Sequence, residues 1–120
     1  MNLHLVPGAV VRAADVVLEH APVPPGQVVE GAPMVGFAVL GEAGVAGGVV
    51  EVGVWEHTPG VSTDNESDEV FVVISGRARI DFIEPELPSI EIGPGDVFRL
   101  AAGMRTVWTV TETLRKVYEA

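Results

Sequence analysis

Short apolar segments broken by glycine and proline constrain the fold of this chain more than any other feature. Between residues 49 and 118 no helical periodicity lasts beyond a turn or so, and the apolar residues instead recur at every second position. One side of the segment that starts at residue 49 carries three valines, whereas Trp55 and His57 lie on the other side; the valines are Val50, Val52 and Val54. The pattern predicts an all-β barrel or sandwich of about eight to ten short strands.

The expected strands follow from β-branched and aromatic runs between turn residues. Residues 69–75 predict a strand buried on both faces, which Gly76 would end, and residues 77–82 predict a separate half-buried strand. The sequence Gly93-Pro94-Gly95-Asp96 predicts a tight turn. Further strands are expected at residues 89–92, 97–100, 106–111 and 114–118.

The first half of the chain is less regular. A chain of 120 residues is long enough for one core and too short for two, so we expect one domain over residues 1–120. Its first 30 residues contain Pro22, Pro24 and Pro25 and predict an extended segment that wraps the domain or reaches a partner. Residues 31–50 are apolar, but Glu42 and six glycines argue against a membrane span, and we interpret them as a buried hairpin.

Composition excludes several classes of partner. Seventeen acidic residues against seven basic ones give a formal charge of −10, which repels phosphate backbones and anionic membrane surfaces. We therefore expect neither nucleic acid nor a membrane as a partner. The chain has no cysteine, and its N-terminus lacks the pattern of a secretory signal, so a cytoplasmic location is the default expectation.

Three motifs in residues 53–118 together resemble the cupin superfamily. Glu69 is followed seven residues later by Gly76, as at the end of the first cupin motif, and residues 93–97 precede Ala101-Ala102-Gly103 as in the second. Residues 53–60, paired with the pattern from Trp108 to Tyr118, look like the ureidoglycine-aminohydrolase-type, or ethanolamine-utilisation-like, subgroup. The resemblance implies a jelly-roll cupin barrel with residues 49–118 as its motif core.

The same resemblance indicates what the chain lacks. In metal-binding cupins, histidines stand six and four residues before the motif glutamate and three residues after the second-motif glycine. Those positions are Thr63, Asn65 and Thr106 here, and none carries an imidazole. We therefore expect no transition metal and no cofactor. A weak metal site built on Glu69 with oxygen ligands and His57 is the alternative.

Glu69 is the candidate catalytic residue. An acid inside a barrel poor in water is a plausible general acid or base, and its alternation partners Phe71 and Val73 predict apolar surroundings. The alternative is a structural ion pair with an arginine; the candidates are Arg77, Arg99 and Arg105.

Aromatic residues provide candidate walls for a ligand. Trp55 and Trp108 lie on strands that should border the barrel interior, and Tyr118 is a possible third wall. Packing in the core is the alternative, since aromatic residues in small β-domains most often do this. Thr63, Asn65 and Thr106 are then expected to orient the ligand between these walls.

Other polar residues carry weaker expectations. The run from Asp64 to Glu69 predicts a solvated loop at the barrel mouth, and His57 predicts an exposed turn residue. None of the serines shows an obvious histidine and acid partner for nucleophilic catalysis. Lys116, the single lysine, would form a Schiff base only if desolvated, and we expect it at the surface or paired with Glu112 or Glu119.

The sequence thus predicts a cupin that binds a small polar metabolite, with isomerase- or hydrolase-like proton transfer by Glu69. A non-catalytic ligand sensor or dimeric assembly module is the first alternative, and a metalloenzyme with oxygen ligands is the second. Cupins commonly pair through edge strands, and the extended N-terminal segment provides such an edge, so a homodimer is expected.

Overall fold

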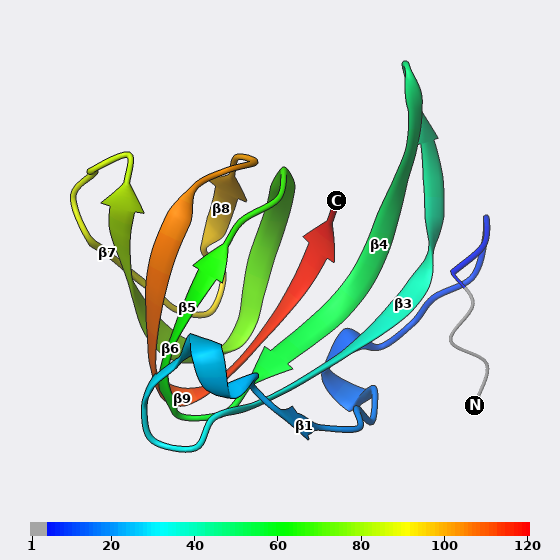
Figure 1. The fold of residues 1–120 in the computed structure, drawn as a ribbon. Coiled ribbons are helices and arrows are strands. Elements are labelled where there is room, and N and C mark those ends of the chain that lie inside the picture. Colours follow the sequence, from blue (N-terminus) through cyan, green and yellow to red (C-terminus); the bar gives the residue numbers. More distant parts are fainter. Residues whose placement is uncertain (1–4) are drawn as a thin grey trace.

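The computed structural model describes residues 5–120, and within them almost every element is a strand (Figure 1). Two short 3-10 turns, η1 and η2, lie in the N-terminal segment, and neighbouring strands pair antiparallel throughout. The all-β prediction is therefore confirmed. The elements are η1 (Ala13–Asp15), β1 (Ala21–Pro22), η2 (Pro25–Gln27), β2 (Val28–Glu30), β3 (Met34–Val45), β4 (Gly48–His57), β5 (Gly60–Asn65), β6 (Glu69–Glu84), β7 (Ile90–Ile92), β8 (Val97–Leu100) and β9 (Arg105–Glu119).

Strand β9 organises the barrel because three other strands pair with it. Its first half pairs with β5, its second half pairs with β4, and its other edge pairs with β6 over nearly its whole length. β3 continues the sheet beyond β4, and β7 and β8 both pair with β6. The sheet curls on itself, and one end of the curl is open (Figure 1).

The two strands expected on either side of Gly76 form one bent strand, β6, so the expectation that Gly76 ends a strand was wrong. Gly76 has φ +90° and lies where the register between β6 and β9 shifts. A Cβ on this glycine would lie 2.7 Å from the Cα of Leu114, so only glycine fits against β9 here. Likewise, residues 106–111 and 114–118 belong to the single strand β9.

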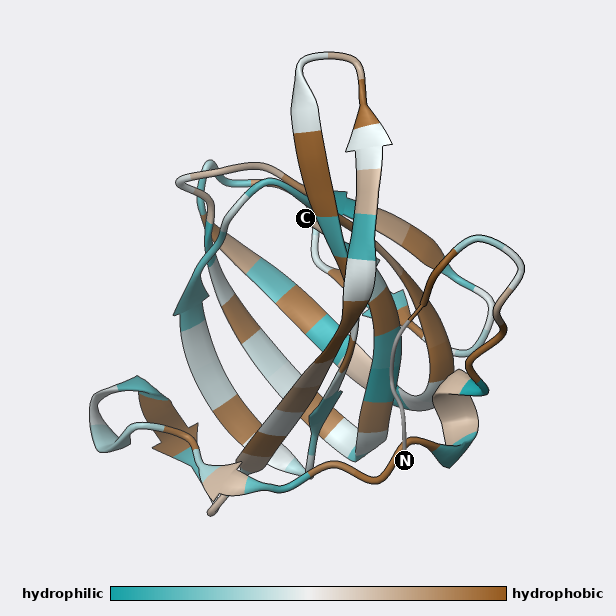
Figure 2. Cartoon of the chain, turned by 90° about the vertical axis from the view of Figure 1, so that its right-hand side faces the viewer, coloured by the Kyte–Doolittle hydropathy of each residue, from teal (hydrophilic) through white to brown (hydrophobic). Residues whose placement is uncertain are grey.

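The hairpin expected in residues 31–50 is present as β3 and β4, but its tip is not buried. Val45 is 48% exposed and Val49 is 62% exposed, and the tip extends beyond the barrel (Figure 2). Ala46 and Gly47 form the turn, and Gly47 has φ +92°. The run is apolar because of its many small residues and valines, and among residues 5–120 no other strand pairs with β3 or β4 at the tip.

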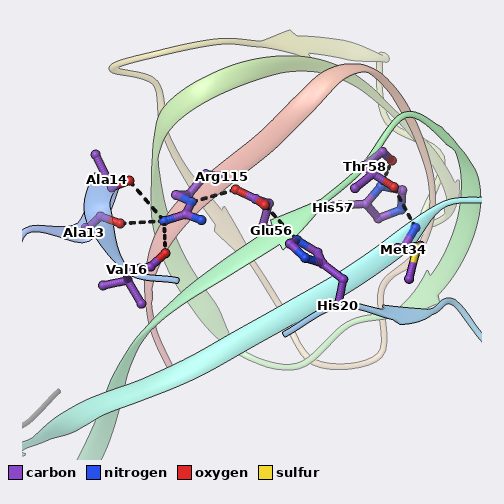
Figure 3. Close-up of polar contacts among 9 residues, drawn as sticks. All are labelled: Ala13, Ala14, Val16, His20, Met34, Glu56, His57, Thr58 and Arg115. Carbon is purple, nitrogen blue, oxygen red and sulfur yellow. Dashed lines mark hydrogen bonds and ion pairs between the residues drawn. The ribbon is translucent and has the colours of Figure 1, made fainter. Parts of the chain in front are cut away.

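The N-terminal segment wraps the outside of this hairpin. Val16 and Leu18 pack against Leu40 and Val54. These four residues form an apolar cluster separate from the barrel interior. Arg115 anchors the segment by donating hydrogen bonds to the backbone carbonyl oxygens of Ala13 (2.9 Å), Ala14 (3.3 Å) and Val16 (2.7 Å) (Figure 3). Its Nε also donates to Glu56 Oε2 at 2.7 Å.

The main core fills the interior below the open end. Phe71, Val73, Ile80, Leu100 and Leu114 are at most 1% exposed and form its centre. In the described part of the chain, no helix has the length and hydropathy needed to cross a membrane.

Candidate functional site

A cavity of about 300 Å³ opens between β4, β5, β6 and β9. Aromatic side chains form part of its lining: Phe37, Trp55, Trp108 and Tyr118. Ala120 also lines the cavity, and polar and charged side chains form the remainder: His57, Ser62, Asp64, Asn65, Glu66, Ser67, Glu69 and Lys116. Cavities of this size and mixed character are typical of small-molecule sites.

Lys116 and Glu69 form a buried ion pair in the cavity wall. Lys116 lies on β9, opposite Trp55 of β4 and Val73 of β6, and its side chain is 5% exposed. Its Nζ lies 3.1 Å from Glu69 Oε1 and 3.2 Å from Glu69 Oε2. Burial lowers the pKa of Lys116, and the negative charge of Glu69 opposes this shift. The pair therefore places an exchangeable proton beside the cavity.

Three aromatic rings surround the same ammonium group. Lys116 Nζ lies 4.3 Å from the ring centroid of Phe71, 4.5 Å from that of Trp55 and 5.1 Å from that of Trp108. These distances are within the range of cation–π attraction. The rings also exclude water from the amine, which is consistent with the direction of its pKa shift.

Glu66 is part of the cavity wall rather than of a solvated loop. Its Oε2 accepts hydrogen bonds from the Thr106 hydroxyl at 2.6 Å and from Trp108 Nε1 at 2.9 Å. Glu66 is 9% exposed and Thr106 is fully buried. The expectation of a solvated acidic run was therefore wrong at this residue, because two donors from β9 compensate its burial.

His57 and Ser62 form a second buried polar pair. The Nδ1–H of His57 donates to the carbonyl oxygen of Thr58 at 2.6 Å, so Nε2 is free to accept from the Ser62 hydroxyl at 2.8 Å. His57 is 2% exposed, so the expectation of an exposed turn residue was wrong. Burial lowers the pKa of His57 and favours its neutral form. A neutral imidazole accepting from a serine hydroxyl is the geometry of a base beside a nucleophile, a pairing that the sequence did not reveal.

Asp64 lies at the rim of the cavity. Although the residue as a whole is exposed, its carboxyl group is partly enclosed, and this desolvation together with the nearby charge of Glu66 raises the pKa of Asp64 to about 6. A carboxyl group with such a pKa exchanges protons near neutral pH.

Tyr118 closes the cavity on the side of β4. Its hydroxyl donates to Glu51 Oε2 at 2.8 Å, and burial, followed by the effect of Glu51, raises the pKa of Tyr118. The ring lies over Gly53, where a Cβ would come within 2.6 Å of the ring carbon that carries the hydroxyl. Glycine at this position leaves the space that the end of the ring occupies.

The structure brings together most of the site residues expected from the sequence. Glu69, Asn65, Trp55, Trp108 and Tyr118 all line the cavity. Thr106 lies behind the wall and contacts Glu66, with Trp108 Nε1 also 3.1 Å from its hydroxyl. Thr63 is not part of this cavity: its hydroxyl lies 3.5 Å from the carbonyl oxygen of Gln27, on the outer side of β5.

Sequence reasoning missed Ser62, Asp64, Glu66 and Lys116. On β5 the inward-facing residues are Ser62 and Asp64 rather than Thr63 and Asn65, although Asn65 reaches the rim at the strand end. The inward position of Lys116 could have been predicted, because Leu114, Lys116 and Tyr118 alternate along β9 and share one face of the strand. The Lys116 partner is Glu69, not Glu112 or Glu119, and none of the three arginines proposed for Glu69 contacts it.

The polar groups of the cavity do not fit a transition-metal centre of the cupin type. Within residues 5–120, no cluster of three or more histidine, aspartate or glutamate side chains has a geometry that would hold a metal ion. Glu69 faces the Lys116 ammonium group with both oxygens, and Glu66 Oε2 already accepts from two protein donors. A divalent cation beside Glu69 would be repelled by the ammonium group.

Comparison with solved structures supports the barrel architecture. A protein of unknown function from Pseudomonas syringae pv. tomato superposes with a TM-score of 0.70 and 23% identity, over 88% of this chain and 44% of that one. A protein of unknown function from Acidithiobacillus ferrooxidans superposes with a TM-score of 0.57 and 20% identity, over 88% of this chain and 91% of that one. The EutQ protein of Clostridium difficile superposes with a TM-score of 0.56 and 16% identity, over 72% of this chain and 61% of that one. The chain thus spans less than half of the Pseudomonas protein and somewhat under two thirds of EutQ.

Family comparison gives a more specific result. No curated protein matches this sequence. The model of the EutQ-like cupin domain matches residues 45–118, which make up most of the barrel and include the cavity strands β4, β5, β6 and β9 but not β3, which contributes Phe37. The jelly-roll prediction is confirmed, and the ureidoglycine-aminohydrolase subgroup stays a prediction. The chain belongs to the EutQ-like cupin domain family.

Proposed function

We propose that the cavity binds a small polar metabolite and that Glu69 transfers a proton to or from it in an isomerase- or hydrolase-like reaction. The observation that carries this proposal is the Lys116–Glu69 ion pair, buried under aromatic walls and still part of the cavity lining. A charged pair that served only to stabilise the fold would gain little from such a position, because desolvation largely cancels the attraction between buried charges.

Charge indicates the kind of ligand. Asp64, Glu66 and Glu69 outnumber the single cation Lys116, and His57 is held neutral. Such a cavity favours neutral or cationic molecules with several N–H donors, and it disfavours anions. Amines and ureides have this character, which agrees with the subgroup resemblance of the sequence.

Glu69 has the contacts that a proton-transfer group needs. It is 14% exposed, so it is reached from the cavity, and Lys116 lies within hydrogen-bond distance of both its oxygens. When Glu69 takes a proton from the ligand, the ammonium group of Lys116 remains close to the negative charge that develops on the ligand. Trp55 and Trp108, with ring centroids 5.8 Å apart and planes tilted by 56°, would form an angled wall for the flat part of the ligand.

Ligand screening tests the proposal. Small amines, ureides and neutral amides are added singly, binding is measured as a rise in melting temperature, and hits are confirmed by native mass spectrometry. We expect a hit whose binding weakens in Glu69→Gln and is unchanged in the control Glu84→Gln, whose side chain is 70% exposed. Equal binding to wild type and Glu69→Gln, without turnover, would instead support the ligand-sensing alternative. Hits unaffected by any substitution in the cavity would contradict the proposed site.

A further inference from the structure

We propose that Lys116 is a nucleophile that forms an imine with a small uncharged aldehyde or ketone bound in the cavity. This inference rests on the proposed binding function and extends it from reversible binding to covalent chemistry. The geometry that supports it is an amine that lines a ligand-sized cavity, is enclosed by three aromatic rings and contacts one carboxylate.

The first step of the argument concerns the state of the amine. An exposed lysine is almost fully protonated at neutral pH and reacts slowly, whereas desolvation favours the neutral nucleophilic form. Lys116 satisfies this condition, since its side chain is 5% exposed and burial lowers its pKa. It is also the only lysine in the sequence.

Glu69 supplies the proton acceptor that the reaction requires. Transfer of one proton from the Lys116 ammonium group to Glu69 leaves a neutral amine beside a neutral carboxylic acid. The nitrogen lone pair forms a bond to the carbonyl carbon, the electrons of the C=O π bond move to oxygen, and proton transfers through Glu69 give a neutral carbinolamine. Protonation of its hydroxyl by Glu69 then lets water leave as the nitrogen lone pair forms the C=N bond. Glu69 finally takes the remaining proton from the nitrogen. The net reaction converts the amine and the carbonyl compound into an imine and water.

Cavity charge selects among carbonyl compounds. A keto acid would bring its carboxylate close to Asp64, Glu66 and Glu69, whereas an uncharged aldehyde meets no such repulsion. The volume of about 300 Å³ accommodates a carbonyl compound of a few carbon atoms against the indole rings.

Reductive trapping tests the inference. Folded full-length protein is incubated at neutral pH with propanal and sodium cyanoborohydride, and peptide mass spectrometry measures alkylation of Lys116 over time. The exposed control is Arg79→Lys, which introduces a lysine at a position whose side chain is 54% exposed. We expect Lys116 to be alkylated at least tenfold faster than the introduced lysine, and pyruvate to react with Lys116 more slowly than propanal. Rates equal to or below that of the introduced lysine would overturn the inference.

Two variants separate the roles of the pair. In Lys116→Arg we expect no alkylation at residue 116. Circular dichroism of this variant should show that it remains folded. Glu69→Gln removes the group that transfers protons while the carbinolamine forms and loses water, so we expect several-fold slower alkylation even though more of the amine is neutral. Faster alkylation would show that Glu69 acts only as a counter-ion and would overturn its role in proton transfer. Cavity ligands that raise the melting temperature without any trapping at Lys116 would refute the imine and leave the binding function intact. Absence of both binding and trapping would refute both proposals.

Discussion

Replacing Arg115 with methionine should destabilise the protein more than any other single substitution of a charged residue that contacts the N-terminal segment. Arg115 is 9% exposed and donates one hydrogen bond to the Glu56 carboxylate and three to the carbonyl oxygens of Ala13, Ala14 and Val16 (Figure 3). Methionine fills similar space without donors, so these acceptors lose their partner. Removing one member of a buried pair typically costs about 3–5 kcal/mol.

The lower end of that range applies here, because Glu56 retains a hydrogen bond from His20 Nε2 at 2.8 Å. Burial alone would raise the pKa of Glu56, but the hydrogen bonds from Arg115 and His20 lower it overall, which shows that the paired carboxylate is the favoured form. We therefore expect a loss of about 3 kcal/mol in the free energy of unfolding, from a total of about 5–15 kcal/mol for a typical domain.

Urea denaturation followed by tryptophan fluorescence measures this loss. With a slope of about 1.5 kcal/mol per molar urea, the midpoint should fall by about 2 M. Arg79→Met is the matched control, because its ion pair with Asp81 is exposed and should contribute less than about 1 kcal/mol. If Arg115→Met costs no more than this control, the argument for a buried anchor fails. Hydrogen exchange in residues 12–18 should also accelerate in the Arg115 variant only.

Two further predictions concern the cavity wall. Below pH 6.5 the free energy of unfolding should fall, because burial lowers the folded-state pKa of His57 and the unfolded chain binds the proton more readily; comparison of His57→Asn with wild type isolates this slope. The pKa of Asp64 is raised to about 6 in the folded state, so between about pH 6 and 4 this residue changes the free energy of unfolding in the opposite direction. Both proteins in the comparison should therefore carry Asp64→Asn. If the free energy of unfolding then depends on pH equally in both, the result contradicts a buried histidine. Gly53→Ala should push the Tyr118 ring away from β4 at a cost of about 1–3 kcal/mol and bring its pKa back toward the ordinary value. Phenolate absorbance of this single tyrosine checks the shift, and identical titration in both proteins would contradict the packing.

Much of the fold was predictable because alternation and turn residues are local signals. The Gly93–Asp96 turn is present, with Gly95 at φ +89° and the Asp96 carboxylate accepting from the backbone N–H of Gly93 at 2.8 Å. Strand boundaries at Gly76 were not predictable, because whether a glycine ends a strand or forms a bulge depends on the register of β9 opposite it.

The residues of the candidate site could be predicted only where the sequence indicated which face of a strand each side chain lies on. The spacing of the cupin motif placed Thr63 and Asn65 in the site, whereas alternation along β5 turns Ser62 and Asp64 toward the cavity, and Asn65 reaches only its rim. Partners distant in sequence, such as Lys116 for Glu69 or Trp108 for Glu66, follow from strand pairing that no local pattern encodes. The homodimer and the N-terminal segment's part in it stay predictions from the sequence.

Titration of the Lys116 side chain by nuclear magnetic resonance tests the central claim most directly, since the chain has one lysine and thus one signal to follow. If the amine is enclosed beside the cavity and paired with Glu69, its pKa will lie below the ordinary value of 10.5, and Glu69→Gln will lower it further. An ordinary pKa that does not respond to Glu69→Gln would show an exposed lysine and contradict the account.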